Sequence, residues 1–250
     1  MPLQVVTVPC LRDNFAFLAH DPASGATAVV DVPEAAPILA ALSQRGWRTT
    51  DILLTHHHDD HVQGLAALQA GLDTPAPVTG AAVDAHRLPP LDHAVGPGDS
   101  VILGQHRGQV LDMSGHTVGH VAFVFDGVAF TGDSLMAMGC GRLFEGTAPM
   151  MWDSLCRLAA LPDATRICSG HDYLSGNLAF AQSVDPGNAA AARRVEEARR
   201  AGPEAVHLTL ADERATNPFL RTQELAGALG MAGRPDVDIF AELRRRKDAF

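Results

Sequence analysis

The stretch THHHDDH, residues 55–61, contains four histidines and two aspartates. It follows the short apolar run DILLT and precedes VQGLAALQAG, whose pattern predicts a helix. In an extended segment alternate side chains share a face, so His56 and His58 can point at one ion while His57 points away. Two histidines cannot complete a tetrahedral metal site, which needs a third protein ligand and, for catalysis, an open position. The remaining ligands must therefore come from other parts of the chain.

Three polar residues further along the chain share one local context. His116 follows GQVLDM, Asp133 follows GVAF and His171 follows RIC, each after a small residue or glycine. Strand ends that converge on one edge of a sheet would bring them together. A single histidine is usually a solvated or structural residue, but this repetition favours a metal site. We expect His57 and Asp59 to be spacers and His120 to lie beside the site. The remaining histidines are expected to be surface or structural residues: His20, His86, His93, His106 and His207.

The composition is that of a globular protein. A chain of 250 residues can bury a core without disulfides. The net charge of -10, from 19 basic and 29 acidic residues, argues against a nucleic-acid or anionic membrane partner, so an anionic ligand needs a local basic patch. The four cysteines show no paired spacing, the first ten residues do not resemble a signal peptide, and no apolar run approaches the roughly 20 residues of a spanning helix. We expect a cytoplasmic monomer with reduced thiols.

The pattern of apolar and turn residues predicts two regions. Strands are expected at 3–8, 15–20, 27–32, 51–55, 100–104, 108–113, 120–126, 127–133 and 165–171, and helices at 34–46, 62–71 and 149–161. The first three strands are expected to be antiparallel, and Asp126-Gly127 predicts a hairpin turn. Past about residue 174 the pattern is helical. The sequence therefore predicts a mixed α/β domain over 1–174 and a helical domain over 175–250.

THHHDDH with GHT, TGD and SGH, in this order and spacing, resembles the metallo-β-lactamase superfamily. The resemblance implies an αββα sandwich with metals at one edge, followed here by a C-terminal all-helical domain. It implies one metal held by His56, His58 and His116, a second held by Asp60, His61 and His171, and Asp133 as a bridge between them. Asp60 and Asp133 would then be catalytic, together with a hydroxide that bridges the metals. Histidine and carboxylate ligands suit zinc, iron and manganese alike, and we expect two zinc ions.

Three further stretches resemble the glyoxalase II, or hydroxyacylglutathione hydrolase, family: VPCLRDNFAFLAH (8–20), SLMAMGCGRLFEGT (134–147) and GHDYLSGNLAFA (170–181). The resemblance implies hydrolysis of S-lactoylglutathione to lactate and glutathione in methylglyoxal degradation. The substrate-binding residues that it implies are Arg142, Phe144, Tyr173, Asn177, Arg244 and Lys247. Glutathione has carboxylates, and Arg244 and Lys247, three positions apart on a predicted helix, can supply the local cations that they need. A solvated basic helix end is the alternative for Arg245 and Arg246.

The sequence departs from the family pattern at two of these positions. Arg142 stands where a lysine is usual, which keeps the charge but changes its geometry, and Phe144 stands where a tyrosine is common, which removes a hydroxyl contact.

Four other functions are alternatives to thioester hydrolysis. A glutathione persulfide dioxygenase of the same superfamily usually lacks the GCGR-type loop and the helical tail. A β-lactamase or lactonase would not explain Arg244, Lys247 or Tyr173. A nuclease conflicts with the acidic charge, and a non-catalytic metal-binding scaffold is least expected because every ligand position is filled.

Overall fold

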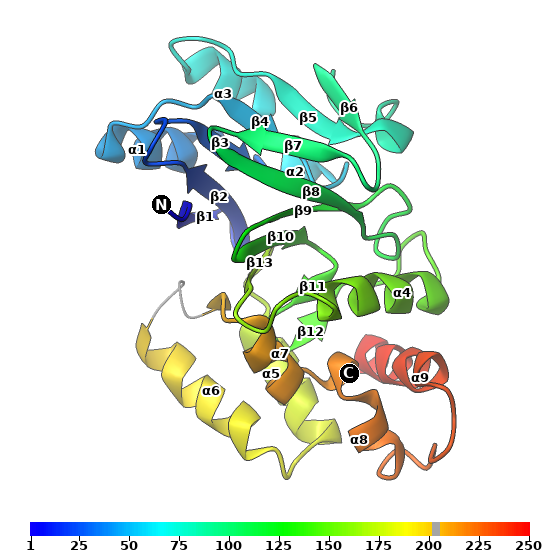
Figure 1. Ribbon diagram of the computed structural model, residues 1–250. Helices are drawn as coiled ribbons and strands as arrows, with labels where there is room; N and C mark the ends of the chain where they lie inside the picture. Colours follow the sequence, from blue (N-terminus) through cyan, green and yellow to red (C-terminus); the bar gives the residue numbers. More distant parts are fainter. Residues whose placement is uncertain (202–205) are drawn as a thin grey trace.

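The computed structural model describes residues 1–201 and 206–250. Two sheets lie face to face in the middle of the molecule, and helices cover the outer face of each (Figure 1). The first sheet has the strand order β1-β2-β3-β4-β5-β6 and the second the order β13-β10-β9-β8-β7. These four layers confirm the αββα sandwich that the sequence resemblance implies.

The strands of the first sheet are β1 (Gln4–Cys10), β2 (Asn14–His20), β3 (Thr27–Val30), β4 (Asp51–Leu53), β5 (Val78–Ala81) and β6 (His93–Val95). Those of the second are β7 (Ser100–Leu103), β8 (His106–Asp112), β9 (Val121–Phe125), β10 (Val128–Gly132) and β13 (Arg166–Ser169), and β11 (Leu135–Met136) pairs with β12 (Gly139–Cys140) in a separate hairpin. The helices are α1 (Ala35–Arg45), α2 (Asp59–Val62), α3 (Leu65–Gly71), α4 (Ala148–Ala159), α5 (Leu174–Val184), α6 (Ala189–Ala201), α7 (Leu210–Thr216), α8 (Thr222–Ala226) and α9 (Asp236–Ala249). Two 3-10 turns, η1 (Ala82–Asp84) and η3 (Pro218–Leu220), complete the elements that the text uses.

The central strands are apolar on both faces because both faces are covered. On β2, Phe15 and Phe17 pack into the core between the two sheets, whereas Ala16 and Leu18 pack into the core under α1 and α3. The ring of Phe17 lies 5.6 Å from that of Phe130 on β10, across the space between the sheets. A strand buried on both faces is a continuous apolar run instead of an alternating one, as in FAFLAH.

The outer face of the second sheet packs against α4 and the C-terminal helices. Ala122 and Ala129 of the sheet share one core with Leu155 of α4, Phe219 of η3 and Phe240 of α9. In Figure 1 these helices lie below the second sheet and continue to the C-terminus. The helical part of the chain is therefore fixed to the sandwich by a common core.

Most of the predicted elements are confirmed. β1, β2 and β3 are antiparallel neighbours, and Phe125 pairs with Val128 across the predicted turn at Asp126-Gly127. The predicted helix over 62–71 is split instead. α2 ends at Val62 and α3 begins at Leu65, and between them the Gly64 amide donates to the Val32 carbonyl at 2.9 Å, outside the helix. The short strands β5 and β6 were not predicted.

The topology brings strand ends to one edge. β8 and β10 are both antiparallel to β9, and β10 is parallel to β13, so β8, β10 and β13 all run in the same direction. His116, Asp133 and His171 follow these three strands, and His56 follows β4 of the first sheet. Among the described residues the elements after β13 are helical, and none of these helices is both long and apolar enough to span a membrane. The division between residues 174 and 175 stays a prediction.

Candidate metal centre

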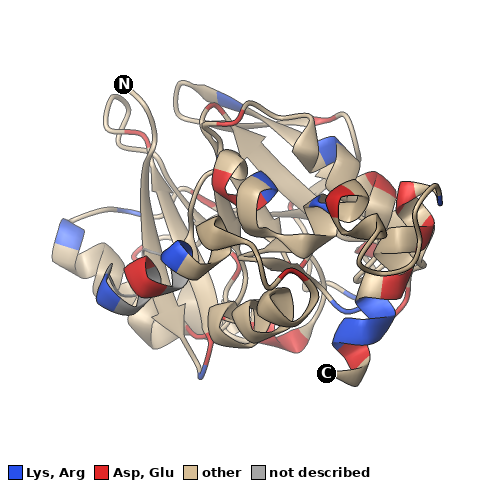
Figure 2. Ribbon diagram, turned by 90° about the horizontal axis from the view of Figure 1, so that it is seen from below, with Lys and Arg blue, Asp and Glu red and all other residues tan. Residues whose placement is uncertain are grey.

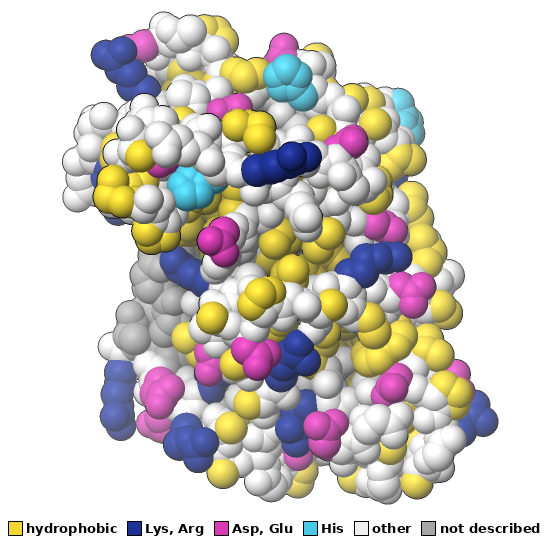
Figure 3. Space-filling view, viewed as in Figure 1, with side chains coloured by type: hydrophobic (Ala, Val, Ile, Leu, Met, Phe, Trp, Pro, Cys, Tyr) yellow, Lys and Arg dark blue, Asp and Glu magenta, His cyan; other side chains and the backbone are white. Residues whose placement is uncertain are grey.

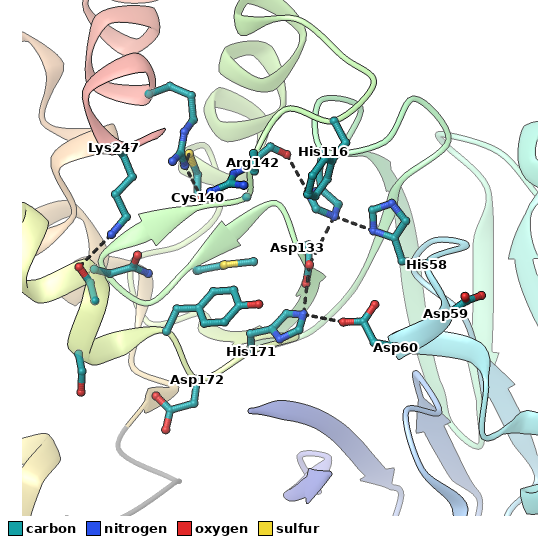
Figure 4. Close-up of a pocket in the computed structure, with 18 residues that line it drawn as sticks. His58, Asp59, Asp60, His116, Asp133, Cys140, Arg142, His171, Asp172 and Lys247 are labelled. Atoms are coloured by element: carbon teal, nitrogen blue, oxygen red, sulfur yellow. Dashed lines mark hydrogen bonds and ion pairs between the residues drawn. The ribbon is translucent and has the colours of Figure 1, made fainter. Parts of the chain in front are cut away.

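Three histidine nitrogens meet at one point of this edge, and Figure 4 shows the rings of His58 and His116 there. We call His56, His58 and His116 the first group. His58 Nδ1 lies 3.1 Å from His56 Nε2 and 3.0 Å from His116 Nε2. The extended chain therefore turns His56 and His58 toward the same point, as the sequence predicts, and the strand end after β8 adds His116.

A second group, Asp60, His61 and His171, lies next to the first. His171 Nε2 lies 3.4 Å from His61 Nε2 and 3.3 Å from Asp60 Oδ2. Asp133 stands between the groups. Its Oδ2 is 3.4 Å from His116 Nε2 and 3.3 Å from His171 Nε2, and its Oδ1 is 3.3 Å from His61 Nε2. The structure thus brings together all seven residues for which the sequence predicts a metal-binding role.

The second ring nitrogen of most of these imidazoles is held by another group. The contacts are His56 Nδ1 to Thr55 Oγ1 at 3.0 Å, His116 Nδ1 to the Arg142 carbonyl at 2.8 Å, His61 Nδ1 to Asp31 Oδ2 at 2.8 Å and His171 Nδ1 to Asp13 Oδ1 at 3.1 Å. Carbonyl and carboxylate partners accept a hydrogen bond, so they place the proton on Nδ1. In the neutral ring, Nε2 is then left with a free lone pair that points into the site.

Sequence reasoning missed these supporting residues. Asn14 donates from Nδ2 to Asp60 Oδ2 at 3.0 Å, and Asp31 accepts from the Thr55 amide at 2.8 Å as well as from the His61 ring. Asp31 follows β3 just as the predicted ligands follow their strands, and that position is the signal that could have identified it. His120 lies beside the site, as predicted, and its Nε2 accepts from the Asp133 amide at 3.0 Å.

The pKa values separate the two groups. Burial lowers the pKa of all three imidazoles of the first group, which keeps them neutral. Burial also opposes the charged form of His61, but Asp133 and Asp31 outweigh it and raise its pKa well above the ordinary value. For His171, hydrogen bonds to Asp133 and Asp60 overcome burial and raise the pKa to about 10. The first group is thus in the form that binds metal, and in the second group a metal ion would displace protons.

One atom tests directly whether a cation fits here. Asp133 Oδ1 is buried and makes no hydrogen bond to any residue that the structure describes, its approach to His61 Nε2 being a charge contact only. A buried carboxylate oxygen without a hydrogen bond is costly unless a cation accompanies it. With neutral imidazoles on one side and carboxylates on the other, the donor set fits divalent metal ions.

A cavity of about 840 Å³ opens beside the two groups. His58, Asp60, His116, Asp133 and His171 line one side of it. All six predicted substrate-binding residues also line it: Arg142, Phe144, Tyr173, Asn177, Arg244 and Lys247. Figure 4 shows Lys247 on the far side of the cavity from His58, and Arg142 between Cys140 and His116. Figure 2 shows that α9 carries basic residues beside the C-terminus.

The six cavity residues are held in different ways. Arg244 is buried and donates from Nη1 to the Cys140 carbonyl at 2.9 Å, and Lys247 Nζ donates to the Gly176 carbonyl at 2.9 Å. Asn177 is also buried, and its amide donates to the Ala137 carbonyl at 2.9 Å.

The other three are more open. The Tyr173 ring stacks on His171 with centroids 4.6 Å apart. Phe144 meets His116 edge-on at 5.2 Å and is 61% exposed. The Arg142 side chain is 62% exposed, and its Nε lies 3.6 Å from Asp248 Oδ1.

Two family models match the chain. One, described as the metallo-beta-lactamase superfamily, matches residues 21–171, and the other, described as hydroxyacylglutathione hydrolase C-terminus, matches residues 172–250. Proteins named hydroxyacylglutathione hydrolase from Cereibacter sphaeroides and Fuscovulum blasticum are 60% and 59% identical over 257 residues, with 100% of both chains covered in each case.

Solved structures share the fold. ETHE1 from Myxococcus xanthus aligns with a TM-score of 0.68 and 25% identity, over 98% of this chain and 90% of that one. TTHA1623, solved in a di-iron-bound form, aligns with a TM-score of 0.61 and 28% identity, over 87% of this chain and 100% of that one.

Proposed function

The chain belongs to the hydroxyacylglutathione hydrolase family of the metallo-β-lactamase superfamily, and we propose that its cavity hydrolyses S-2-hydroxyacylglutathione thioesters such as S-lactoylglutathione. The observation that supports this substrate is the position of three cations, Arg142, Arg244 and Lys247, in the same cavity as the candidate metal ligands. A glutathione thioester joins carboxylates to a reactive carbonyl. In the cavity, the cations can bind the carboxylates while the carbonyl lies at the candidate metal ligands.

We assign the candidate ligands to two ions. His56, His58 and His116 would hold the first, Asp60, His61 and His171 the second, and Asp133 would bridge them. When bound, such ions supply a hydroxide near neutral pH and polarise the thioester carbonyl, because coordination lowers the pKa of water from 15.7 to about 7. The di-iron form of TTHA1623 supports two ions. We propose zinc, with iron and manganese as the alternatives that the same donors accept.

The chain's own residues bind and orient the substrate. Arg244 and Lys247 lie one helical turn apart on α9 and can bind a glutathione carboxylate, and the exposed Arg142 can bind a second. Asp60 stays ionised because its hydrogen bond to His171 lowers its pKa, and it is half open to the cavity. It can therefore accept a hydrogen bond from the attacking water and orient it. Glutathione leaves as a stable thiolate, so no general acid is required.

The persulfide dioxygenase alternative shares the need for glutathione-binding cations. Eight curated relatives between 51% and 60% identical to this chain are all named hydroxyacylglutathione hydrolase. The comparisons therefore favour the hydrolase.

Removing single ligands tests the proposal. His58→Ala and Asp133→Ala should each lower hydrolysis of S-lactoylglutathione by about a hundredfold or more, since losing even a residue that only supports a metal ligand costs about 10- to 100-fold. Metal content measured on the same samples should fall with activity. His86→Ala, which removes an exposed histidine away from the site, is the control and should match the wild type. Wild-type activity in either ligand variant would refute the assignment.

The proposal also covers the location of the protein and its partners. On the face shown in Figure 3, acidic and basic side chains are interspersed, which gives a polyanion no continuous basic surface there. We propose a cytoplasmic monomer whose partner is a small glutathione thioester. Sedimentation at micromolar protein concentration would reveal a dimer if that part of the proposal is wrong.

A further inference from the structure

The β11–β12 hairpin is held by side chains of the C-terminal helices. Asn177 of α5 donates to the Ala137 carbonyl, and Arg244 of α9 donates to the Cys140 carbonyl, both at 2.9 Å. Asn217, directly after α7, donates from Nδ2 to the carbonyls of Met136 at 3.1 Å and Gly139 at 2.9 Å. Side chains from the C-terminal part of the chain thus donate hydrogen bonds to backbone carbonyls of the hairpin. In the sequence this hairpin lies between β10 and β13 of the second sheet.

The hairpin leads directly to the candidate metal centre. It begins just after Asp133, and it is followed by Arg142, whose carbonyl accepts from the His116 ring at 2.8 Å. At Gly141 a Cβ would lie 1.9 Å from the Asp133 carbonyl oxygen, so the two segments touch backbone to backbone. Met136 and Cys140 line the cavity themselves. Any shift of the hairpin therefore moves the wall against which the substrate binds.

The turn of the hairpin has an unfavourable backbone conformation. Met138 has a φ of +54° although it is not glycine, and its side chain is fully buried. A non-glycine residue in this conformation is strained and persists only where its surroundings impose it. Here the Met138 amide donates to Glu213 Oε2 at 2.9 Å. The same carboxylate oxygen accepts from Asn217 Nδ2 at 2.9 Å, so Glu213 also orients the amide that holds the two strands.

Glu213 faces a buried arginine on its other side. It is 1% exposed, and its Oε1 pairs with Arg194 Nη2 of α6 at 2.5 Å, with Arg194 itself 3% exposed. Breaking a buried pair on one side is costly, because the remaining charge stays in a medium of low polarity. The two carboxylate oxygens have separate tasks: one meets the arginine and the other meets the hairpin.

We infer that Glu213 is a positioning residue for substrate binding, which acts through the hairpin on the cavity wall that includes Cys140 and Arg142. The inference rests on the proposed function, since substrate binding is measured with a glutathione thioester. Glu213 itself does not line the cavity, so its effect reaches the substrate only through the residues that it holds.

Replacing Glu213 with glutamine distinguishes its contact with Arg194 from its contacts with the hairpin and Asn217. Glutamine has one acceptor oxygen, and in Glu213→Gln the buried charge of Arg194 attracts it, which turns the amide NH₂ toward the Met138 and Asn217 donors. The hairpin then faces a donor where it needs an acceptor. In the double variant Glu213→Gln with Arg194→Gln, no arginine charge attracts the side-chain oxygen at position 213 away from Met138. The oxygen of the first glutamine can then return to Met138, while its NH₂ donates to the glutamine that replaces Arg194.

The experiment measures KM and kcat for S-lactoylglutathione, and the affinity for glutathione itself by titration calorimetry. Glu213→Gln should raise both KM and the Kd of glutathione about fivefold or more, with kcat and metal content close to wild type. The double variant should restore both constants toward wild type. A merely structural role would lower the unfolding temperature in every variant and leave the two constants unchanged.

Asp185→Asn is the matched control, since it removes a carboxylate that pairs with Arg221 at 3.1 Å in the same helical region and has no contact with the hairpin in the described structure. It should leave KM and the glutathione Kd unchanged. If Glu213→Gln does not fold, Asn217→Ala is the deciding variant, because it removes the hydrogen bonds to the Met136 and Gly139 carbonyls and keeps the ion pair between Glu213 and Arg194. Unchanged constants in the folded variant, or no recovery in the double variant, would overturn the inference. A wild-type protein without thioesterase activity would instead refute the proposed function.

Discussion

Single residues of this protein often have an ionisation state set by burial. His207 is 4% exposed, and its ring packs edge-on against Phe15 and Phe17 with centroids 4.8 and 5.0 Å away. Burial, and after it the nearby charges of Arg166 and Arg194, lower the pKa of His207 to about 3. The folded protein therefore keeps this ring neutral, whereas the unfolded chain takes up a proton near pH 6.5.

This difference predicts a pH-dependent contribution to stability. Because the unfolded state binds the extra proton, the contribution of His207 is constant above about pH 6.5 and is lost progressively as the pH falls toward 3. Between pH 6.5 and 5 the loss amounts to about 2 kcal/mol. The free energy of unfolding of His207→Phe, measured with urea at pH 7 and pH 5, should thus fall less than that of the wild type. His86→Phe is the control, and an equal decrease in the wild type and His207→Phe would contradict the prediction.

At the same scale, the sequence predicted the candidate ligands but not their supports. The seven ligands could be recognised because four lie in one short segment and the others follow strands in similar contexts. Asp31 and Asp13 are separated from His61 and His171 by 30 and 158 positions, and only the folded chain shows that they touch. Contacts of this kind depend on strand pairing, which a single sequence does not specify.

Among the elements, helix α9 combines two cations with different surroundings. Lys247 Nζ lies 5.3 Å from the centre of the Phe180 ring and 5.6 Å from that of Phe250. The side chain lines the cavity, and burial lowers its pKa. Arg244 is buried and bonded to the hairpin and to Asp248. The two residues that the sequence treats as a pair thus differ: Lys247 is available to a ligand, and Arg244 also supports the fold.

Substituting Lys247 should therefore affect binding alone. Lys247→Met keeps the packed stem and removes the charge, so KM for S-lactoylglutathione should rise about tenfold, equivalent to about 1.4 kcal/mol, with kcat unchanged. Arg245→Met is a matched control on the same helix, since Arg245 is 70% exposed and pairs only with Glu242 among the described residues. A rise in KM in both variants would indicate general electrostatic attraction instead of a specific contact.

Element prediction failed where tertiary contacts decide. β5 and β6 are three or four residues long and become strands by pairing in parallel with their neighbours, β5 with β4 and β6 with β5. At the break between α2 and α3 the Gly64 amide donates to the Val32 carbonyl, outside the helix. The β11–β12 hairpin likewise depends on Glu213 and Asn217, which lie about 75 residues away in the chain. The local sequence pattern therefore identified the long helices and strands. It missed the short elements that form only through contacts with distant parts of the chain.

At the scale of the whole molecule, metal ions should stabilise the fold. The candidate ligands come from both sheets and are mostly buried, so ions bound there would hold the layers together in the native state only. Removal of metal with a chelator should lower the unfolding temperature by several degrees, and zinc should restore it in a concentration-dependent way. The test is differential scanning calorimetry on the two forms. Asp133→Ala should respond little to zinc, and an equal response in this variant would place the stabilising metal elsewhere.

The short segment 96–99 connects the last strand of the first sheet to the first strand of the second. All six strands of the first sheet precede it and all five of the second follow it. His56, His58, Asp60 and His61 are on one side of this segment, and His116, Asp133 and His171 are on the other. A chain cut at this point would give two fragments, neither of which has a complete set of ligands for either ion. Their reassembly would depend on metal, so the centre would act as a cross-link between the halves of the protein as well as the place of its chemistry.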